Sequence, residues 1–372
     1  MRDLTCPGVV ALIDSADSAL AWWRTVAPFT RLRQHHVPAR WSLLSEASVR
    51  LNPADVVVFP RLFPLDAPGG REAMLTNTVE PIREHSAALV YDLDDDLISE
   101  AYIDHHLRTD WGDGKTADDM RRQCENTLWA VNQCDAVTAA SESLAAYLRT
   151  LTGRPVYTVP NAIDVRWYRS RLAARSLWAD RLTIGWAGGR RPEADFGAMA
   201  EAWGRVARRR PDVVFVVAGD PSARRFAARH VPSDQVQHIE WAHVQDMPMA
   251  MQVNIGCCSV EGTPFDLCKT PIKAWEYGIA GAAVVASPAL YSQDVADGFT
   301  GRLAETADEW EAALMDLLDD EEQRRHLAAN MATRVEQRHS LDLNLANWPR
   351  AWNAAVESRH RHGKMEMQNA SA

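Results

Sequence analysis

The chain has 372 residues, of which 47% are hydrophobic and 24% are charged, and its net charge is −10 at pH 7. A chain of this length predicts two domains, each with its own core. The acidic balance argues against nucleic-acid binding through a broad basic surface, and no apolar run approaches the roughly 18 residues that a membrane-spanning helix needs. The six cysteines lack the paired spacings of a zinc site, so buried thiols and no metal centre are expected.

The first apolar run, residues 8–14, predicts a buried strand. Acidic residues follow it where a signal peptide would carry a small-residue cleavage site, so we expect a cytoplasmic protein. Residues 14–36 come next and place Trp23 beside Arg24. An aromatic ring beside an arginine suits stacking on a sugar or a base, or peripheral contact with a membrane. An amphipathic helix that packs its tryptophans inward accounts for the same pattern equally well.

Carboxylates crowd the end of the predicted strand at 87–94, in the stretch "YDLDDDL" that contains Asp92, Asp94, Asp95 and Asp96. Like charges at this spacing raise one another's pKa values unless a partner is present. Three interpretations stay open. The carboxylates could ligate a divalent metal, hold the hydroxyl groups of a ligand or accept its proton, or form a solvated helix start.

The order of strand-like and helix-like segments predicts an α/β fold with two Rossmann-like parallel sheets facing each other across a cleft. Because residues 161–180 are polar and arginine-rich, we place the boundary near 175, giving domains at 1–175 and 176–338. The expected strands of the first domain are 8–14, 54–60, 87–94, 135–141 and 155–161. Those of the second domain are 182–188, 212–220, 236–242, 253–259 and 282–288.

The first strand of the second domain runs into Gly188 and Gly189, followed by Arg190 and Arg191. Two glycines let backbone N–H groups approach a phosphate closely, and the arginines supply charge. The stretch matches neither the dinucleotide fingerprint nor the P-loop, and an ordinary tight turn explains it as well.

The stretch "LCKTPIKAWEYGIAGAAVVAS", residues 267–287, holds two of the only four lysines in a chain with thirty-six arginines. Thr270 and Pro271 predict a helix start, Gly281 predicts its end, and Lys273 then shares a face with Glu276. A cation in the first turn opposes the helix dipole unless an anion binds there. Lys269, Lys273 and the helix start therefore predict a diphosphate site. Solvated lysines, with Glu276 merely paired to Lys273, are the plainer alternative.

The chain turns wholly helical from residue 308 onward. The segment 339–358 opens with a break at His339 and Ser340 and continues as a helix that carries Trp348 and Trp352 on one face. Residues 359–372 offer little apolar surface and are expected to form a flexible tail.

Seven segments in this order resemble the GT-B glycosyltransferases, most closely glycosyltransferase family 4. They are "AWWRTVAPFTRL", "YDLDDDL", "VPNAID", "IGWAGG", "VVAGD", "FDLCKTPIKAWEYGIAGAAVVAS" and "VADGFTGRL". The resemblance implies transfer of a sugar from a nucleotide-diphosphate donor, with retention of configuration and no obligatory metal or cofactor. It also implies that the helix 339–358 crosses back to the first domain. The acceptor stays open among a glycan, a lipid-linked sugar, a small metabolite and a modified nucleic-acid base.

The resemblance also implies roles for single residues. Glu276 would accept the ribose hydroxyls, while Lys269 and Lys273 would hold the diphosphate with the amides of Gly188 and Gly189. The implied residue sets are Lys269, Lys273, Asp94 and Asp95 for catalysis, Arg190 and Arg191 for help with the donor, and Trp23, Arg24, Asp92 and Asp94 for the acceptor. One departure stands out: Cys268 occupies the position of the family's first glutamate, and the nearby Asp266 is the candidate to replace it.

Two other classes of function fit parts of the pattern. A GT-B-shaped sugar-nucleotide epimerase or phosphorylase would need an acid and a base, for which His238 and His243 are available but not convincingly spaced. A non-catalytic carbohydrate-binding relative would explain Cys268. The retained Lys269 and Glu276 favour the transferase.

Overall fold

The computed structural model describes residues 7–16, 18–43, 55–61, 70–85, 87–109, 113–172, 178, 180–240 and 244–370. The chain divides into two compact units. The first comprises Met1–Ile103, Lys115–Asn161 and Leu341–Ala372, and the second comprises Asp104–Gly114 and Ala162–Ser340. The boundary that we expect near residue 175 falls outside the described residues, and so does His243.

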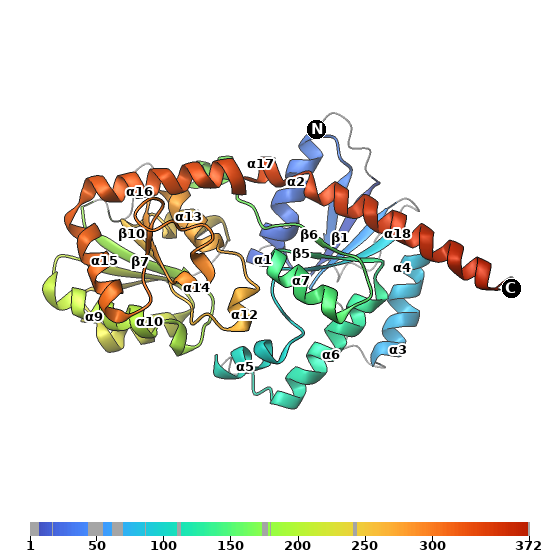
Figure 1. Cartoon of the computed structure of the whole chain (residues 1–372), viewed down its shortest axis with the longest axis horizontal. Coiled ribbons are helices and arrows are strands. Elements are labelled where there is room, and N and C mark those ends of the chain that lie inside the picture. The colour runs from blue at the N-terminus through green and yellow to red at the C-terminus, as the bar shows by residue number, and fades with distance from the viewer. Residues whose placement is uncertain are drawn as a thin grey trace. The chain divides into compact units, whose positions relative to one another are not determined.

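A parallel sheet forms the centre of the first unit (Figure 1). Its described strands, in spatial order, are β2 (Ala39–Leu43), β1 (Val9–Ile13), β3 (Val56–Pro60), β4 (Ala88–Leu93), β5 (Ala136–Ala139) and β6 (Val156–Thr158). Strands β1, β3 and β4 are buried along their whole length, which explains their unbroken apolar sequences. The edge strand β2 is half-buried beyond its first residue and is absent from the sequence-based expectation.

Most helices of the first unit connect its strands, and the last two follow the second unit in the chain. π-helical segments lie at Trp22–Val26 and Leu75–Val79. The helices are α1 (Ala19–Ala21), α2 (Ala27–Gln34), α3 (Gly70–Met74), α4 (Glu80–Glu84), α6 (Ala117–Gln133), α7 (Glu142–Leu151), α17 (Leu341–Asn344) and α18 (Asn347–Ala370). Helix α5 (Glu100–Arg108) begins in the first unit, and its last five residues belong to the second.

The C-terminal helix α18 packs on the first unit, to which residues 341–372 belong. The ring of Phe29 meets Trp352 at 5.3 Å and Trp348 at 6.3 Å between centroids, both edge-on. The helix continues to Ala370, past the end that we expect at residue 358. Arg359 anchors this extension, because its guanidinium donates to the carbonyl of Arg83 and lies 3.9 Å from the carboxylate of Asp135.

A second parallel sheet forms the centre of the second unit. Its described strands, in spatial order, are β12 (Arg302–Leu303), β11 (Ala283–Ala286), β10 (Ile255–Cys258), β7 (Thr183–Gly188), β8 (Val214–Gly219) and β9 (Val236–Glu240). The two-residue strand β12 is a further element that the sequence pattern does not predict. The two Rossmann-like sheets confirm the predicted fold class.

Helices cover both faces of this sheet. They are α8 (Val165–Arg171), α9 (Gly197–Arg209), α10 (Pro221–His230), α11 (Met247–Ala250), α12 (Pro264–Leu267), α13 (Ile272–Ala280), α14 (Pro288–Tyr291), α15 (Ala307–Asp319) and α16 (Glu321–Arg334). Short 3₁₀ segments at Glu193–Asp195 and Val244–Asp246 and a π-helical segment at Val335–His339 complete the unit.

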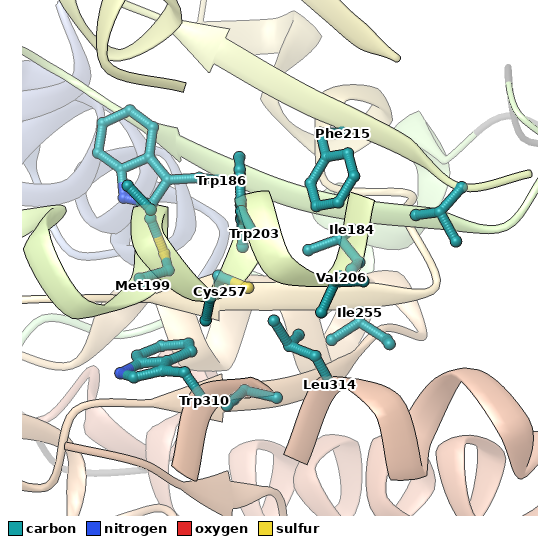
Figure 2. Close-up of a cluster of buried hydrophobic side chains, with 14 of the residues drawn as sticks. Ile184, Trp186, Met199, Trp203, Val206, Phe215, Ile255, Cys257, Trp310 and Leu314 are labelled. Carbon is teal, nitrogen blue, oxygen red and sulfur yellow. The ribbon is translucent and has the colours of Figure 1, made fainter. Parts of the chain in front are cut away.

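The core of the second unit lies between the sheet and the helices α9 and α15 (Figure 2). Trp203 of α9 and Trp310 of α15 are almost fully buried there, around the side chains of Ile184, Phe215 and Ile255 from three neighbouring strands. Because side chains alternate along a strand, the chain neighbours of Ile184, Phe215 and Ile255 point to the opposite face of the sheet. Helix α13 packs on that face. None of the helices in the described part of the chain has the length and hydropathy of a membrane span.

Candidate functional site

Helix α13 begins one residue later than the sequence predicts. Pro271, with ψ of 37°, is the residue before the first helical position, so the helix starts at Ile272 and not at Pro271. Lys273 remains in the first turn, three residues before Glu276. Gly281 ends the helix in the left-handed conformation, with φ of 87°, as its position in the sequence predicts.

Glu276 is the single carboxylate of α13, and it is buried. The residue is 1% exposed, and its Oε1 atom accepts no hydrogen bond from the part of the chain that the structure describes. Burial raises the pKa of Glu276 to about 7, although the charge of Lys273 acts to lower it. A buried carboxyl without a hydrogen-bond partner costs folding free energy, so such groups are concentrated at functional sites.

Lys273 lies beside the end of β7. A Cβ atom added at Gly188 would come within 3.3 Å of Lys273 Cε and 2.7 Å of the Trp186 ring, so a glycine at position 188 leaves room for the lysine. Burial lowers the pKa of Lys273, and Glu276 opposes the shift while Arg191 adds to it. The position of Gly189 is open, with nothing within 4 Å of an added Cβ atom. The end of β7 and the start of α13 thus meet as the sequence predicts.

Lys269 lies between α12 and α13, with its Nζ atom 4.0 Å from the centre of the Phe265 ring. This distance is that of a cation–π contact, which holds the ammonium group without neutralising it. Phe265 also contacts His105, at 4.2 Å between ring centroids. His105 comes from α5, a helix that the sequence does not connect with this site.

Arg191 joins two buried carboxylates. Its Nη1 atom donates to Asp195 Oδ2 and to Asp266 Oδ1, both at 3.2 Å. Asp266 is fully buried and also caps α12, where it accepts from the Thr263 backbone N–H at 3.2 Å and from the Thr263 hydroxyl at 2.9 Å. Cys268 is buried close by in sequence. Asp266 is therefore already engaged at both oxygens, which weakens it as a replacement for the missing glutamate.

Arg190 points to a different partner. Its Nε atom donates to Asp220 Oδ2 at 3.3 Å, and Asp220 caps α10 by accepting from the Ser222 N–H at 2.8 Å. This contact lies at the ends of β7 and β8. The two neighbouring arginines therefore have different partners, Asp220 for Arg190 and the pair Asp195 and Asp266 for Arg191.

Arg24 and Asp92 form a buried ion pair in the first unit, where the sequence analysis assigns them to an acceptor. The guanidinium donates from Nη2 to Asp92 Oδ1 at 2.6 Å and from Nε to Oδ2 at 2.9 Å, and both side chains are almost fully buried. Arg24 also donates to the carbonyl of Val159 at 2.6 Å, and Thr138 donates to Asp92 at 2.5 Å. The pair thus connects four parts of the unit instead of presenting free groups to a ligand.

Asp94 and Asp95, at the end of β4, share a partner that the sequence analysis misses. Arg61 forms an ion pair with each of them from the end of β3. Burial raises the pKa of Asp94, and Arg61 acts in the opposite direction. Arg61 has a positive φ of 56°, an uncommon conformation for a residue with a side chain. Its position directly after a strand is the only sequence signal that could have indicated it.

Trp23 is half-buried in the π-helical segment Trp22–Val26 that follows α1. Irregular helical turns of this kind are frequent at functional sites. Of the first-unit residues that the sequence singles out, Trp23, Asp94 and Asp95 keep part of their surface exposed.

Tyr168 on α8 is a second residue that the sequence analysis misses. It is fully buried, and its hydroxyl has no hydrogen-bond partner among the described residues. Burial raises the pKa of Tyr168 well above its usual value, with a contribution from the charge of Glu276. Helix α8 contacts α13, so two buried polar atoms without partners belong to neighbouring helices.

A family-model match lies within the unit that holds this site: residues 181–320 match the model described as Glycosyl transferases group 1. The comparison with curated proteins gave no match.

Solved structures share the fold over most of the chain. The HepE protein of Anabaena, solved with UDP and glucose, is 16% identical with a TM-score of 0.61, covering 94% of this chain and 100% of that one. Sucrose-phosphate synthase of Thermosynechococcus elongatus is 14% identical, with a TM-score of 0.58 and coverage of 94% and 100%. The pneumococcal O-GlcNAc transferase GtfA, solved with UDP and GlcNAc, is 14% identical, with a TM-score of 0.57 and coverage of 82% and 58%.

The fold and the family match together define a class. The chain has the fold of the GT-B glycosyltransferases, and residues 181–320 of its second unit match the Glycosyl transferases group 1 family.

Proposed function

We propose that the protein transfers a sugar from a nucleoside-diphosphate donor to an acceptor hydroxyl, and that the donor binds at the start of α13. The observation that carries this proposal is the buried Glu276 carboxyl, whose Oε1 lacks a hydrogen-bond partner in the described chain. A carboxylate accepts hydrogen bonds from the two hydroxyls of a ribose, which would supply the missing partners. Two lysines of a lysine-poor chain lie in sequence within seven residues of it.

The chemistry of the reaction explains the lysines. Cleavage of the bond between the sugar and the diphosphate leaves negative charge on the departing oxygen. Lys269 and Lys273, with the amides of Gly188 and Gly189, would stabilise this charge more in the transition state than in the ground state. Loss of one such donor typically reduces the rate by about 10²–10³. We assign Lys269 and Lys273 as catalytic on this basis.

We assign the acceptor to the first unit, at Trp23, Asp94 and Asp95. A half-buried tryptophan can stack on a sugar, and the two carboxylates can hold hydroxyl groups or receive a proton. Arg24 and Asp92 would act by fixing the backbone around this site, since their side chains satisfy each other.

The reaction is proposed to proceed with retention and without an obligatory metal, as in glycosyltransferase family 4. In the described part of the chain, no group of three histidine, cysteine or acidic side chains could hold a metal ion. The arginines paired with Asp92, Asp94 and Asp95 already supply positive charge there. Turnover of the donor should accordingly survive an excess of EDTA, and abolition by EDTA would contradict this part of the proposal.

A calorimetric and thermal-shift screen with UDP, GDP, dTDP and ADP tests the function. A ligand that binds only the folded protein raises the unfolding temperature, and at a fixed concentration a tighter ligand raises it more. UDP is the first candidate, because the HepE and GtfA structures contain it. At least one nucleotide should bind to the wild type and bind more weakly to Glu276→Gln. Failure of all four to bind would contradict the proposal.

A further inference from the structure

Close contacts fix α13 on two sides. A Cβ atom at Gly256 of β10 would lie 2.3 Å from Tyr277 Cγ, and one at Gly278 would lie 2.2 Å from Met331 Cγ of α16. The two glycines thus let the helix approach both the sheet and a neighbouring helix. Such contacts set the distance of α13 from its neighbours, and its rotation about its own axis depends on them together with the other side chains that hold the helix.

A three-residue cluster holds a further side of α13. Trp275, next to Glu276 in the chain, donates from Nε1 to Asp294 Oδ2 at 3.1 Å. The Nε2 atom of His339 lies 2.8 Å from Asp294 Oδ1, and the ring of His339 stacks on Trp275 with 4.0 Å between centroids and 13° between planes. Asp294 and Trp275 are buried. One carboxylate therefore fixes both rings of a stacked pair.

The charge of Asp294 is stabilised by these neighbours. Burial alone would raise its pKa, but the hydrogen bond and charge of His339, the indole N–H of Trp275 and the charge of Arg334 together lower it. Arg334 lies at 3.4 Å from Oδ1 and also donates to the carbonyl of Gln293 at 2.7 Å. An ionised carboxylate makes stronger hydrogen bonds than a neutral one, so the cluster is a rigid one.

His339 also lies where the chain leaves the second unit. Its carbonyl accepts from the N–H of Ile163 at 2.8 Å, and Ile163 pairs with Ser340 in an isolated bridge. Residues 162 and 340 are the ends of the main segment of this unit. The cluster thus connects α13 to the two chain ends of its own unit.

We propose that Trp275, Asp294 and His339 are positioning residues that fix the rotation of α13 and thereby hold Glu276 for the donor nucleotide. This inference rests on the proposed function, since it assigns a ligand to Glu276. Glu276 is buried without a partner for Oε1, so the helix would gain from turning this carboxyl toward water. Trp275 is offset by about 100° around the helix axis, and its hydrogen bond and stack oppose that turn.

Two substitutions separate positioning from simple stability. Asp294→Asn keeps the size of the side chain and removes its charge, and Trp275→Phe keeps an aromatic ring and removes the N–H. Trp203→Phe is the matched control, because Trp203 is a buried tryptophan of the same unit that packs on Phe215 of β8, at 5.1 Å between centroids. All three variants are expected to lower the unfolding temperature.

Two quantities are measured on the full-length protein. Calorimetry gives the affinity for UDP, and hydrogen exchange without nucleotide gives the exchange rates of the backbone amides of residues 272–280. We expect Asp294→Asn and Trp275→Phe to bind UDP about tenfold more weakly and to exchange faster over α13, since each loses a hydrogen bond to a charged group. Trp203→Phe should match the wild type in both measurements.

Unchanged exchange over α13 in Asp294→Asn overturns the inference, as does UDP affinity equal to that of the wild type. A loss of UDP affinity in Trp203→Phe equal to that in Asp294→Asn and Trp275→Phe would also overturn it, because lower folding stability alone would then explain the weaker binding. If the wild type binds none of UDP, GDP, dTDP and ADP, the proposed function fails, and the exchange measurement alone then decides whether the cluster anchors α13.

Discussion

The carboxyl of Glu276 connects donor binding to pH. Its pKa of about 7 means that the group changes charge near neutral pH, and only the ionised form accepts hydrogen bonds at both oxygens. UDP affinity of the wild type should therefore be highest above pH 7 and should fall by about tenfold for each pH unit below it.

Calorimetry between pH 6 and 8.5 measures this effect. Glu276→Gln cannot titrate, so its profile reports the ionisation of the nucleotide alone and serves as the control. A wild-type profile parallel to that of Glu276→Gln would contradict the assigned role.

The same carboxyl should reduce the stability of the protein at alkaline pH. Its pKa in the folded state is about 7, above the ordinary value of 4.5. The contribution of such a group to the free energy of unfolding is fully present below its unfolded pKa, here 4.5, and is lost as the pH rises through its folded pKa of about 7. Glu276→Gln should therefore have a free energy of unfolding in urea that is higher than that of the wild type at pH 8 by roughly 3 kcal/mol, and show little of this gain at pH 4.5. An equal difference at both pH values would contradict the explanation.

Single residues were predictable from sequence where their type was rare. Lysine is scarce in this chain, so Lys269 and Lys273 singled out the helix start that Thr270 and Pro271 predict, on the helix that also carries Glu276. The pairing of Arg24 with Asp92 spans 68 residues and is a tertiary contact. Arginine is abundant in the chain, so neither this pair nor Arg61 had a local signal.

The packing of α13 against β10 depends on Gly256 and not on Gly189. Gly256→Ala would place a methyl group 2.3 Å from the Tyr277 ring, and overpacking of this kind costs about 1–3 kcal/mol of folding stability. Gly189→Ala meets no atom within 4 Å and should change stability by less than about 0.5 kcal/mol. It should nevertheless weaken UDP binding, because its methyl group would occupy the space proposed for the diphosphate.

Urea unfolding and calorimetry on both variants test this contrast. The explanation is wrong if Gly189→Ala binds UDP as the wild type does, or if Gly256→Ala is as stable as the wild type.

Strands and helices were predictable where burial imposed a pattern. The fully buried strands, such as β3 and β8, have unbroken apolar sequences. The edge strand β2 reads "ARWSL" and is mostly half-buried, so its sequence carries no such pattern. Helix α13 starts one residue after the predicted position, because the backbone of Pro271 lies outside the helical region. Sequence propensities do not specify this detail.

The two-sheet architecture was predictable because each half of the chain repeats the alternation of strand and helix. The exchange of segments between the units was only partly predictable. The family resemblance implied the return of the C-terminal helix to the first unit, where Trp348 and Trp352 of α18 pack on Phe29.

Residues 104–114 of the first half, by contrast, belong to the second unit. Arg108 pairs with Glu261 at 2.6 Å, and His105 packs on Phe265. Both contacts span more than 150 residues, and no local pattern encodes them.

The central claim is that the start of α13 binds the diphosphate of the donor. Calorimetric affinities of UDP and UMP for the wild type and for Lys273→Met test it most directly, because the two ligands differ by one phosphate. The wild type should bind UDP at least about tenfold more tightly than UMP, and Lys273→Met should lose most of that preference. Equal affinities for UDP and UMP in the wild type, or an undiminished preference in Lys273→Met, would contradict the claim.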